Sequence, residues 1–109
     1  MREDRVYLEH IRDALDRVVA YTQGGRDVFL DDPKTQDAVI RNLEIVGEAV
    51  KQLSIELMET YPDIPWKRIS GFRDVLIHHY FGIKLDTVWE VVQREIPVLR
   101  AAINQILKS

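Results

Sequence analysis

The feature that most constrains the fold of this chain is a long series of apolar residues spaced for one helix after Pro33. Their steps of three and four residues place them on one side of an α-helix, which turns once every ~3.6 residues. The series is Val39, Leu43, Val46, Val50, Leu53 and Leu57, and a second apolar side carries Ala38, Ile45 and Ala49. A helix with two apolar sides needs two packing partners. The sequence therefore predicts a central helix that starts at an Asp32 N-cap followed by Pro33 and ends near Met58.

Three further amphipathic segments surround this predicted helix, over residues 4–22, 71–81 and 86–107. Gly24-Gly25 should end the segment over residues 4–22, and Gly82 should close the segment over residues 71–81. The two prolines of Tyr61–Trp66 deny a helix there. No repeat or strand-like alternation is present. The predicted class is all-α, a single domain over residues 1–109 folded as an antiparallel four-helix bundle, with its last helix kinked at Pro97.

Composition restricts the kind of protein further. A chain of 109 residues has the size of one domain, and it lacks cysteine, so disulfides and thiolate metal sites are excluded. No apolar run approaches the ~18 residues of a membrane span, and the start of the chain does not resemble a signal peptide. A cytoplasmic location is expected. The net charge of −3 argues against a general nucleic-acid binder, but not against an enzyme that holds one or two phosphates.

The chemistry of the chain concentrates in Arg73-Asp74-Val75-Leu76-Ile77-His78-His79-Tyr80. The permanent cation of Arg73 suits a phosphate and its transition-state charge, and His78 can exchange a proton near neutral pH. An arginine and a histidine are the minimum set for metal-free cleavage of a phosphodiester. Asp74 lies one helical turn before His78 and is expected to support it by orienting the imidazole. No metal ion and no other cofactor is expected.

Helical geometry complicates this site. Arg73 and His78 lie about 140° apart on an ideal helix, so they do not meet within one copy of it. The length of the arginine side chain, or a second copy of the helix across a two-fold axis, would bring them together. His79 falls on the apolar side of the same helix and is expected to pack inward. His10, beside the apolar stripe of the first segment, is given no catalytic part.

The predicted central helix also has a charged stripe, whose members Arg41, Glu44, Glu48 and Lys51 are three or four residues apart. One interpretation is a solvated, ion-paired face. The other is that the stripe faces the helix of Arg73, so that Glu44 and Glu48 position the arginine or shape access to it. Gly47, inside the helix, costs ~1 kcal/mol relative to alanine, which a close helix–helix contact or an approaching ligand would explain.

The spacing from Arg73 to Tyr80 is also R-x4-H-x-Y, the signature of HEPN-domain ribonucleases. Together with Arg41–Ala49, Tyr61–Trp66, Gly71–Asp74 and Val88–Val92, it makes nearly the whole chain resemble the HepT toxins of HepT–MntA toxin–antitoxin systems. The resemblance implies a HEPN-like bundle and a metal-independent endoribonuclease that cleaves RNA by attack of the 2′-OH. It also implies that Arg73 and His78 act at the cleft of a homodimer. DNA and membrane partners are not expected.

In that family the tyrosine of the signature receives AMP from the MntA nucleotidyltransferase, so the resemblance implies that an MntA-like antitoxin adenylylates Tyr80. Position 74 holds Asp where Asn is also common in the family, and an acidic neighbour would weaken the grip of Arg73 on phosphate. Two alternatives stay open: a non-catalytic HEPN module that binds nucleotides or its nucleotidyltransferase partner, and a purely structural dimeric bundle.

Overall fold

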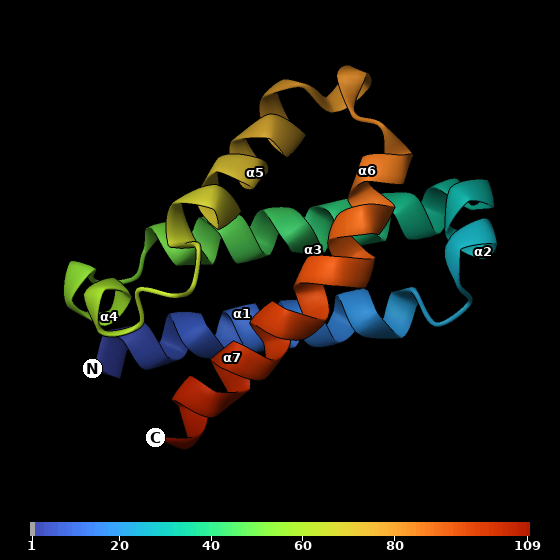
Figure 1. The fold of residues 1–109 in the computed structure, drawn as a ribbon. Coiled ribbons are helices and arrows are strands. Elements are labelled where there is room, and N and C mark those ends of the chain that lie inside the picture. The colour runs from blue at the N-terminus through green and yellow to red at the C-terminus, as the bar shows by residue number, and fades with distance from the viewer. Residues whose placement is uncertain (1) are drawn as a thin grey trace.

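The computed structural model describes residues 2–109, apart from the side chains at positions 2 and 80. Every regular element of the described part is a helix or a helical turn, which confirms the all-α class (Figure 1). The helices are α1 (Arg2–Tyr21), α2 (Arg26–Asp31), α3 (Pro33–Lys51), α4 (Ile55–Thr60), α5 (Trp66–His78), α6 (Leu85–Glu90) and α7 (Ile96–Lys108), with a 3-10 turn η1 (Tyr80–Gly82) and a π-helical turn η2 (Val91–Glu95). Helices α1 and α3 run antiparallel side by side, and α5 and α6–α7 lie across them. This arrangement is the predicted bundle.

The core lies where the apolar stripes of these helices meet. Ile11, Leu15 and Val18 of α1 are fully enclosed. Val39 of α3 and Ile103 of α7 are enclosed with them, so the predicted stripes of the first, central and last helices do face inward. Burying side chains of this size is the main source of stability for such a bundle, at roughly 1.5–3 kcal/mol each.

The central helix ends earlier than the apolar stripe predicts. It stops at Lys51, and α4 begins a new helix after Ser54, so the prediction of one helix to Met58 is wrong. The Ser54 hydroxyl accepts a hydrogen bond from the backbone N–H of Leu57 (3.1 Å), which makes it the N-cap of α4. The buried carboxylate of Asp4 in turn accepts bonds from the Ser54 backbone N–H (2.8 Å) and hydroxyl (2.7 Å). A contact from α1 therefore fixes the break.

The beginning of α3 agrees with the sequence, because the Asp32 carboxylate accepts a hydrogen bond from the Lys34 backbone N–H (3.1 Å) and Pro33 occupies the first turn. The first helix also ends before the two glycines, as predicted, and Gly25 has a φ of 91° that favours glycine. The short α2 that follows was not predicted. It buries Phe29 against Trp89 of α6, with the ring centroids 5.4 Å apart.

Helix α5 begins at Trp66, five residues before the predicted start at Gly71. Pro65 precedes it immediately and, lacking an N–H, leaves no donor to satisfy there. The Trp66 indole N–H donates to the carbonyl of Tyr61 (3.0 Å), so the connector folds back onto the helix that it precedes. The helix ends at His78 rather than at Phe81, and the η1 turn follows.

The last helix is interrupted next to Pro97, as the proline predicts. The backbone N–H of Ile96 donates to the carbonyl of Val91, five residues earlier, which is the hydrogen bond of a π-helix. Pro97 has no N–H to offer the preceding turn, and its ring crowds the carbonyl of Gln93, so the wider turn relieves that clash.

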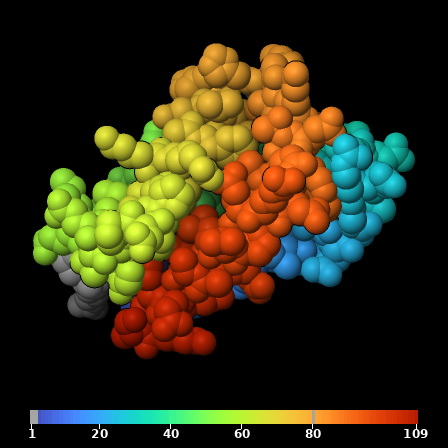
Figure 2. All heavy atoms as spheres, in the orientation of Figure 1, coloured from blue at the N-terminus to red at the C-terminus, as the bar shows by residue number. Residues whose placement is uncertain are grey.

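Helix α5 packs chiefly against α3. A groove of about 600 Å³ separates it from η2 and α7, with the apolar side chains of Leu43 and Val46 of α3 at its floor. Figure 2 shows the recess between the yellow α5 and the orange to red α7. Within residues 2–109, no helix combines the length and the apolar character that crossing a membrane requires.

Candidate functional site

The contact between α3 and α5 is built around Gly47. A Cβ atom placed at Gly47 would lie 2.2 Å from Cβ of Arg73 and 3.3 Å from the backbone oxygen of Ile69. Only a residue without a side chain permits this approach. The close helix–helix contact expected from an interior glycine is therefore present, and the side chain that it accommodates is the arginine of the R-x4-H-x-Y pattern.

Two carboxylates hold the guanidinium of Arg73. Its Nη2 lies 3.0 Å from Glu48 of α3, and its Nη1 donates to Asp74 Oδ1 at 3.2 Å. Its Nε is buried and makes no hydrogen bond to any side chain or backbone atom of the described residues. The arginine side chain is only 24% exposed, whereas Glu48 and Asp74 are about half exposed. Arg73 is thus fixed at the base of the site by groups that solvent can reach.

Asp74 also accepts a hydrogen bond from Lys51 of α3, whose Nζ lies 2.7 Å from Oδ1. The Lys51 bond, and next the bond from Arg73, lower the pKa of Asp74 below its ordinary value. Sequence reasoning assigned Asp74 to the imidazole of His78, but the contacts described for this carboxylate are with the two cations. Its contacts are thus with Arg73 and Lys51, and Lys51 was predicted only as a member of the charged stripe of the central helix.

The charged stripe of α3 contacts α5 at two of its four residues, so each of its two interpretations holds for one part of the stripe. Glu48 and Lys51 bond to α5 directly, while Glu44 is largely covered and lies 3.4 Å from Nη1 of Arg41. Arg41 itself is 70% exposed. The Glu48–Lys51 end of the stripe therefore supports residues of α5, while its Arg41–Glu44 end is an ion pair within α3.

His78 and Arg73 do not share a contact among the described residues. Arg73 is turned toward α3, and His78 is exposed as the last residue of α5. His79 is exposed too, so the prediction that it packs inward is wrong. Its backbone, at φ −124° and ψ 35°, has already left the helix, and helical periodicity no longer applies to it. The side chain of Tyr80, the predicted site of adenylylation, lies outside the described part of the structure.

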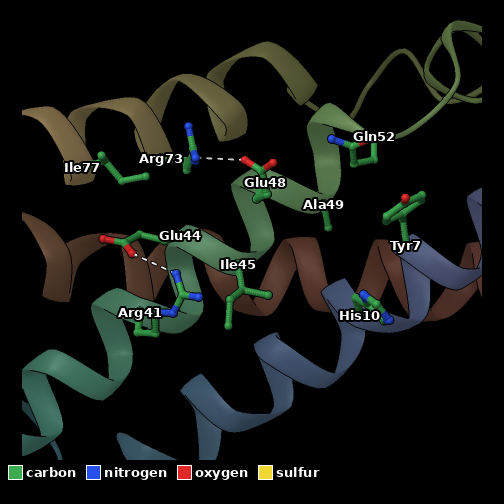
Figure 3. A pocket seen from close by; sticks show the side chains of 10 residues that line it. All are labelled: Tyr7, His10, Arg41, Glu44, Ile45, Glu48, Ala49, Gln52, Arg73 and Ile77. Atoms are coloured by element: carbon green, nitrogen blue, oxygen red, sulfur yellow. Dashed lines mark hydrogen bonds and ion pairs between the residues drawn. The ribbon is translucent and has the colours of Figure 1, made fainter.

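Arg73 lines a shallow pocket of about 190 Å³ that three helices form. Figure 3 shows Arg73 and Ile77 of α5 on one side of it, and Tyr7 and His10 of α1 on the other. Between them lie residues of α3 and Gln52, the residue that follows it: Arg41, Glu44, Ile45, Glu48, Ala49 and Gln52. The rings of Tyr7 and His10 meet edge to face, with centroids 6.1 Å apart. No spacing within the chain links these α1 residues to Arg73, because only the packing of α1 and α5 on α3 brings them to one pocket.

The described residues contain no group of three or more histidine, aspartate and glutamate side chains arranged to hold a metal ion. The site instead offers two cations, Arg73 and Lys51, beside carboxylates, with an exposed imidazole at the end of the same helix. Such a set can bind an anion and stabilise negative charge, and it can exchange a proton nearby.

Comparison with known proteins connects this chain to one family. The model described as "Ribonuclease HepT-like" matches residues 11–106. A Caldanaerobacter subterraneus protein named "Putative RNase" is 41% identical over 110 residues, covering all of this chain and 98% of its own. The "Probable ribonuclease HepT" of Thermococcus cleftensis is 39% identical over 111 residues, covering 98% of each chain.

One relative is a larger protein. The "Gamma-glutamylcyclotransferase and putative RNase" of Methanocaldococcus jannaschii is 44% identical over 111 residues. The match covers all of this chain, which spans half the length of that relative. No solved structure matches the chain significantly.

Proposed function

Because the chain belongs to the HepT-like ribonuclease family, we propose that it is a cytoplasmic toxin-type endoribonuclease whose site contains Arg73 and His78. The observation that carries the proposal is the packing of Arg73 against Gly47. This contact, together with the ion pair to Glu48, holds a guanidinium beside an open pocket in one orientation. Fixed charge of this kind stabilises the developing charge of a reacting phosphate without reorganising.

The proposed reaction uses the RNA itself as nucleophile and needs no metal ion. A basic imidazole of His78 accepts the proton of a ribose 2′-OH while the 2′ oxygen attacks the adjacent phosphorus. The bond from phosphorus to the 5′ oxygen breaks, and that oxygen takes up the proton from the imidazolium that has just formed. The products are a 2′,3′-cyclic phosphate and a free 5′-OH. Arg73 binds the non-bridging oxygens as charge accumulates on them.

A homodimer completes the site in this proposal. Arg73 is turned toward α3 while His78 stands exposed at the end of α5, so two copies meeting at this end would bring Arg73 of one to His78 of the other. Val75 and Ile77 of α5 are 45% and 40% exposed. Apolar residues open to solvent beside His78 favour burial against a second copy.

Control of the activity is proposed to occur at Tyr80, two residues after His78 in the sequence. An MntA-like nucleotidyltransferase antitoxin would transfer AMP to its hydroxyl, which forms a phosphodiester and releases pyrophosphate from ATP. The added nucleotide carries negative charge and bulk and would compete with RNA for Arg73. It would exclude RNA from the site.

One observation favours a second candidate, a non-catalytic module that binds nucleotides or the nucleotidyltransferase. Both terminal nitrogens of Arg73 are engaged by carboxylates, so a phosphate must compete for them. This candidate predicts anion or partner binding without RNA turnover. A purely structural dimer predicts neither.

Cleavage of RNA by the purified protein in EDTA separates these candidates. The wild-type protein, His78→Ala and His79→Ala would be compared, after intact mass has shown Tyr80 to be unmodified. His79 is the matched control because it is an exposed neighbour without an assigned role. We expect cleavage by wild type and His79→Ala, a loss of about 100-fold or more for His78→Ala, and 2′,3′-cyclic phosphate ends. Equal cleavage by His78→Ala would remove this residue from the site, and dependence on a metal ion would overturn the mechanism.

A further inference from the structure

One carboxylate oxygen in this structure lies between two cations from different helices. Oδ1 of Asp74 is 2.7 Å from Nζ of Lys51 and 3.2 Å from Nη1 of Arg73. Lys51 is in the last turn of α3 and Arg73 is in α5, and the Gly47 contact fixes how the two helices sit against each other. The position of Oδ1 is therefore a point at which a single oxyanion receives charge-assisted hydrogen bonds from both an ammonium and a guanidinium.

We propose that Lys51 and Arg73 together form a binding site for one phosphoryl group, and that the carboxylate of Asp74 occupies this site in the free protein. The identity of the ligand as a backbone phosphate of RNA rests on the proposed function. A non-bridging phosphate oxygen takes the place of Asp74 Oδ1, and the second non-bridging oxygen faces solvent or the pocket. Lys51 is then a phosphate-binding residue, and Asp74 is an internal competitor.

The exchange requires no movement of the backbone. The side chains of Lys51 and Asp74 are 37% and 46% exposed, so the carboxylate can rotate away from the cations into water. Glu48 continues to hold Nη2 of Arg73 during the exchange, because its contact is on the other terminal nitrogen of the guanidinium. The arginine thus keeps its orientation while Nη1 changes its acceptor.

Charge balance indicates why Asp74 matters. Two cations, Lys51 and Arg73, face two carboxylates, Glu48 and Asp74, so the free site is close to neutral. When Asp74 turns away, or is replaced by asparagine, one positive charge is uncompensated. Asparagine preserves the shape and removes the competing charge, so Asp74→Asn should strengthen anion binding, whereas most losses of an ion pair weaken a site.

Binding of a fluorescent 2′-O-methyl RNA oligonucleotide, followed by anisotropy at several salt concentrations, tests this site without requiring cleavage. We expect Asp74→Asn to bind about tenfold more tightly than wild type, since it removes a charged competitor. In the Asp74→Asn background, Lys51→Ala should lose about tenfold in affinity and lower the log–log salt slope by about one, which marks a lost phosphate contact. Lys51→Arg in the same background should restore most of the affinity and most of the salt slope.

Lys34→Ala is the matched control, because Lys34 is an exposed lysine at the opposite end of the same helix. Equal affinity of wild type and Asp74→Asn, or equal salt slopes for Lys51→Ala and Lys34→Ala, would overturn the proposal. Because the probe has no 2′-OH, its binding is independent of turnover. If the variants bind RNA as expected but wild type does not cleave it, the phosphate site is supported and the proposed nuclease activity is contradicted. If wild type cleaves RNA but Lys51→Ala does not change the salt slope of binding, the nuclease is supported and the phosphate site is contradicted.

Discussion

Gly47 and Arg73 approach more closely than two residues with side chains allow, since a Cβ at position 47 would lie 2.2 Å from that of Arg73. This contact sets the separation of α3 and α5. It also fixes the position from which the arginine side chain extends. Gly47 therefore contributes both to the stability of the fold and to the geometry of the site.

Replacing Gly47 with alanine should therefore damage both properties. The added methyl group forces α5 away from α3, at a cost of about 1–3 kcal/mol typical of overpacking, and RNA cleavage should fall with it. Gly71→Ala is the control, because it lies inside α5 with nothing within 4 Å of an added Cβ. It should raise stability by roughly 0.5–1 kcal/mol. Urea unfolding of both variants measures the difference, and a Gly47→Ala protein as stable as wild type would contradict the packing argument.

A site shared between two copies predicts complementation. Arg73→Ala and His78→Ala should each be inactive alone. If Arg73 of one copy acts with His78 of the other, a mixed dimer of the two variants has one intact site, and random mixing should restore about a quarter of wild-type activity. The measurement is RNA cleavage after the two variants are unfolded and refolded together, with each variant refolded separately as control. Absence of recovery despite mixed dimers would place both groups in one copy.

The pKa of Asp74 predicts how acid acts on the α3–α5 contact. Because Lys51 and Arg73 lower its pKa below 3.8 in the folded protein, its contribution to stability is fully present above that value. It is lost as the pH falls through the lowered folded-state pKa. Asp74→Asn should accordingly melt slightly below wild type at neutral pH, and the two melting curves should converge in strong acid. A gap of constant size between pH 7 and about pH 2 would show that the ion pairs add nothing to stability.

The carboxylate of Asp4 should be worth more than an ordinary surface group, since it is 4% exposed and accepts two hydrogen bonds from Ser54. Asp4→Ala leaves the Ser54 backbone N–H without its partner, and a loss of about 1–3 kcal/mol is expected. Asp13→Ala, at an exposed position of the same helix, should change stability by less than about 0.5 kcal/mol. Chemical unfolding compares them, and equal effects would mean that water replaces the lost bonds.

Local sequence signals predicted much of this fold, because they act within one or two helical turns. The Asp32 cap, the Gly24-Gly25 stop and the interruption at Pro97 all depend on adjacent residues. The break after Lys51 does not, since it depends on Asp4, which is 50 residues from Ser54 in the sequence. The apolar spacing continues through that break, so periodicity alone predicts one uninterrupted helix.

The site was predictable in part for the same reason. The spacing of the motif identified Arg73, and the charged stripe identified Glu48 as a possible neighbour. The bond from Lys51 to Asp74 joins two helices, so it follows only from the register that Gly47 sets between them. The exposure of His79 depends on where α5 ends, and helix ends are poorly determined by periodicity.

The groove between α5 and α7 leaves the helix of Arg73 attached chiefly to a single neighbour, α3. A helix with one main packing surface opens at a lower free energy than helices enclosed on several sides. Backbone amides of α5 should therefore exchange with deuterium sooner than those at the interface of α1 and α3. The arginine is then carried by a helix that opens more readily than α1 and α3, and a ligand or partner that binds α5 should slow the exchange of its amides.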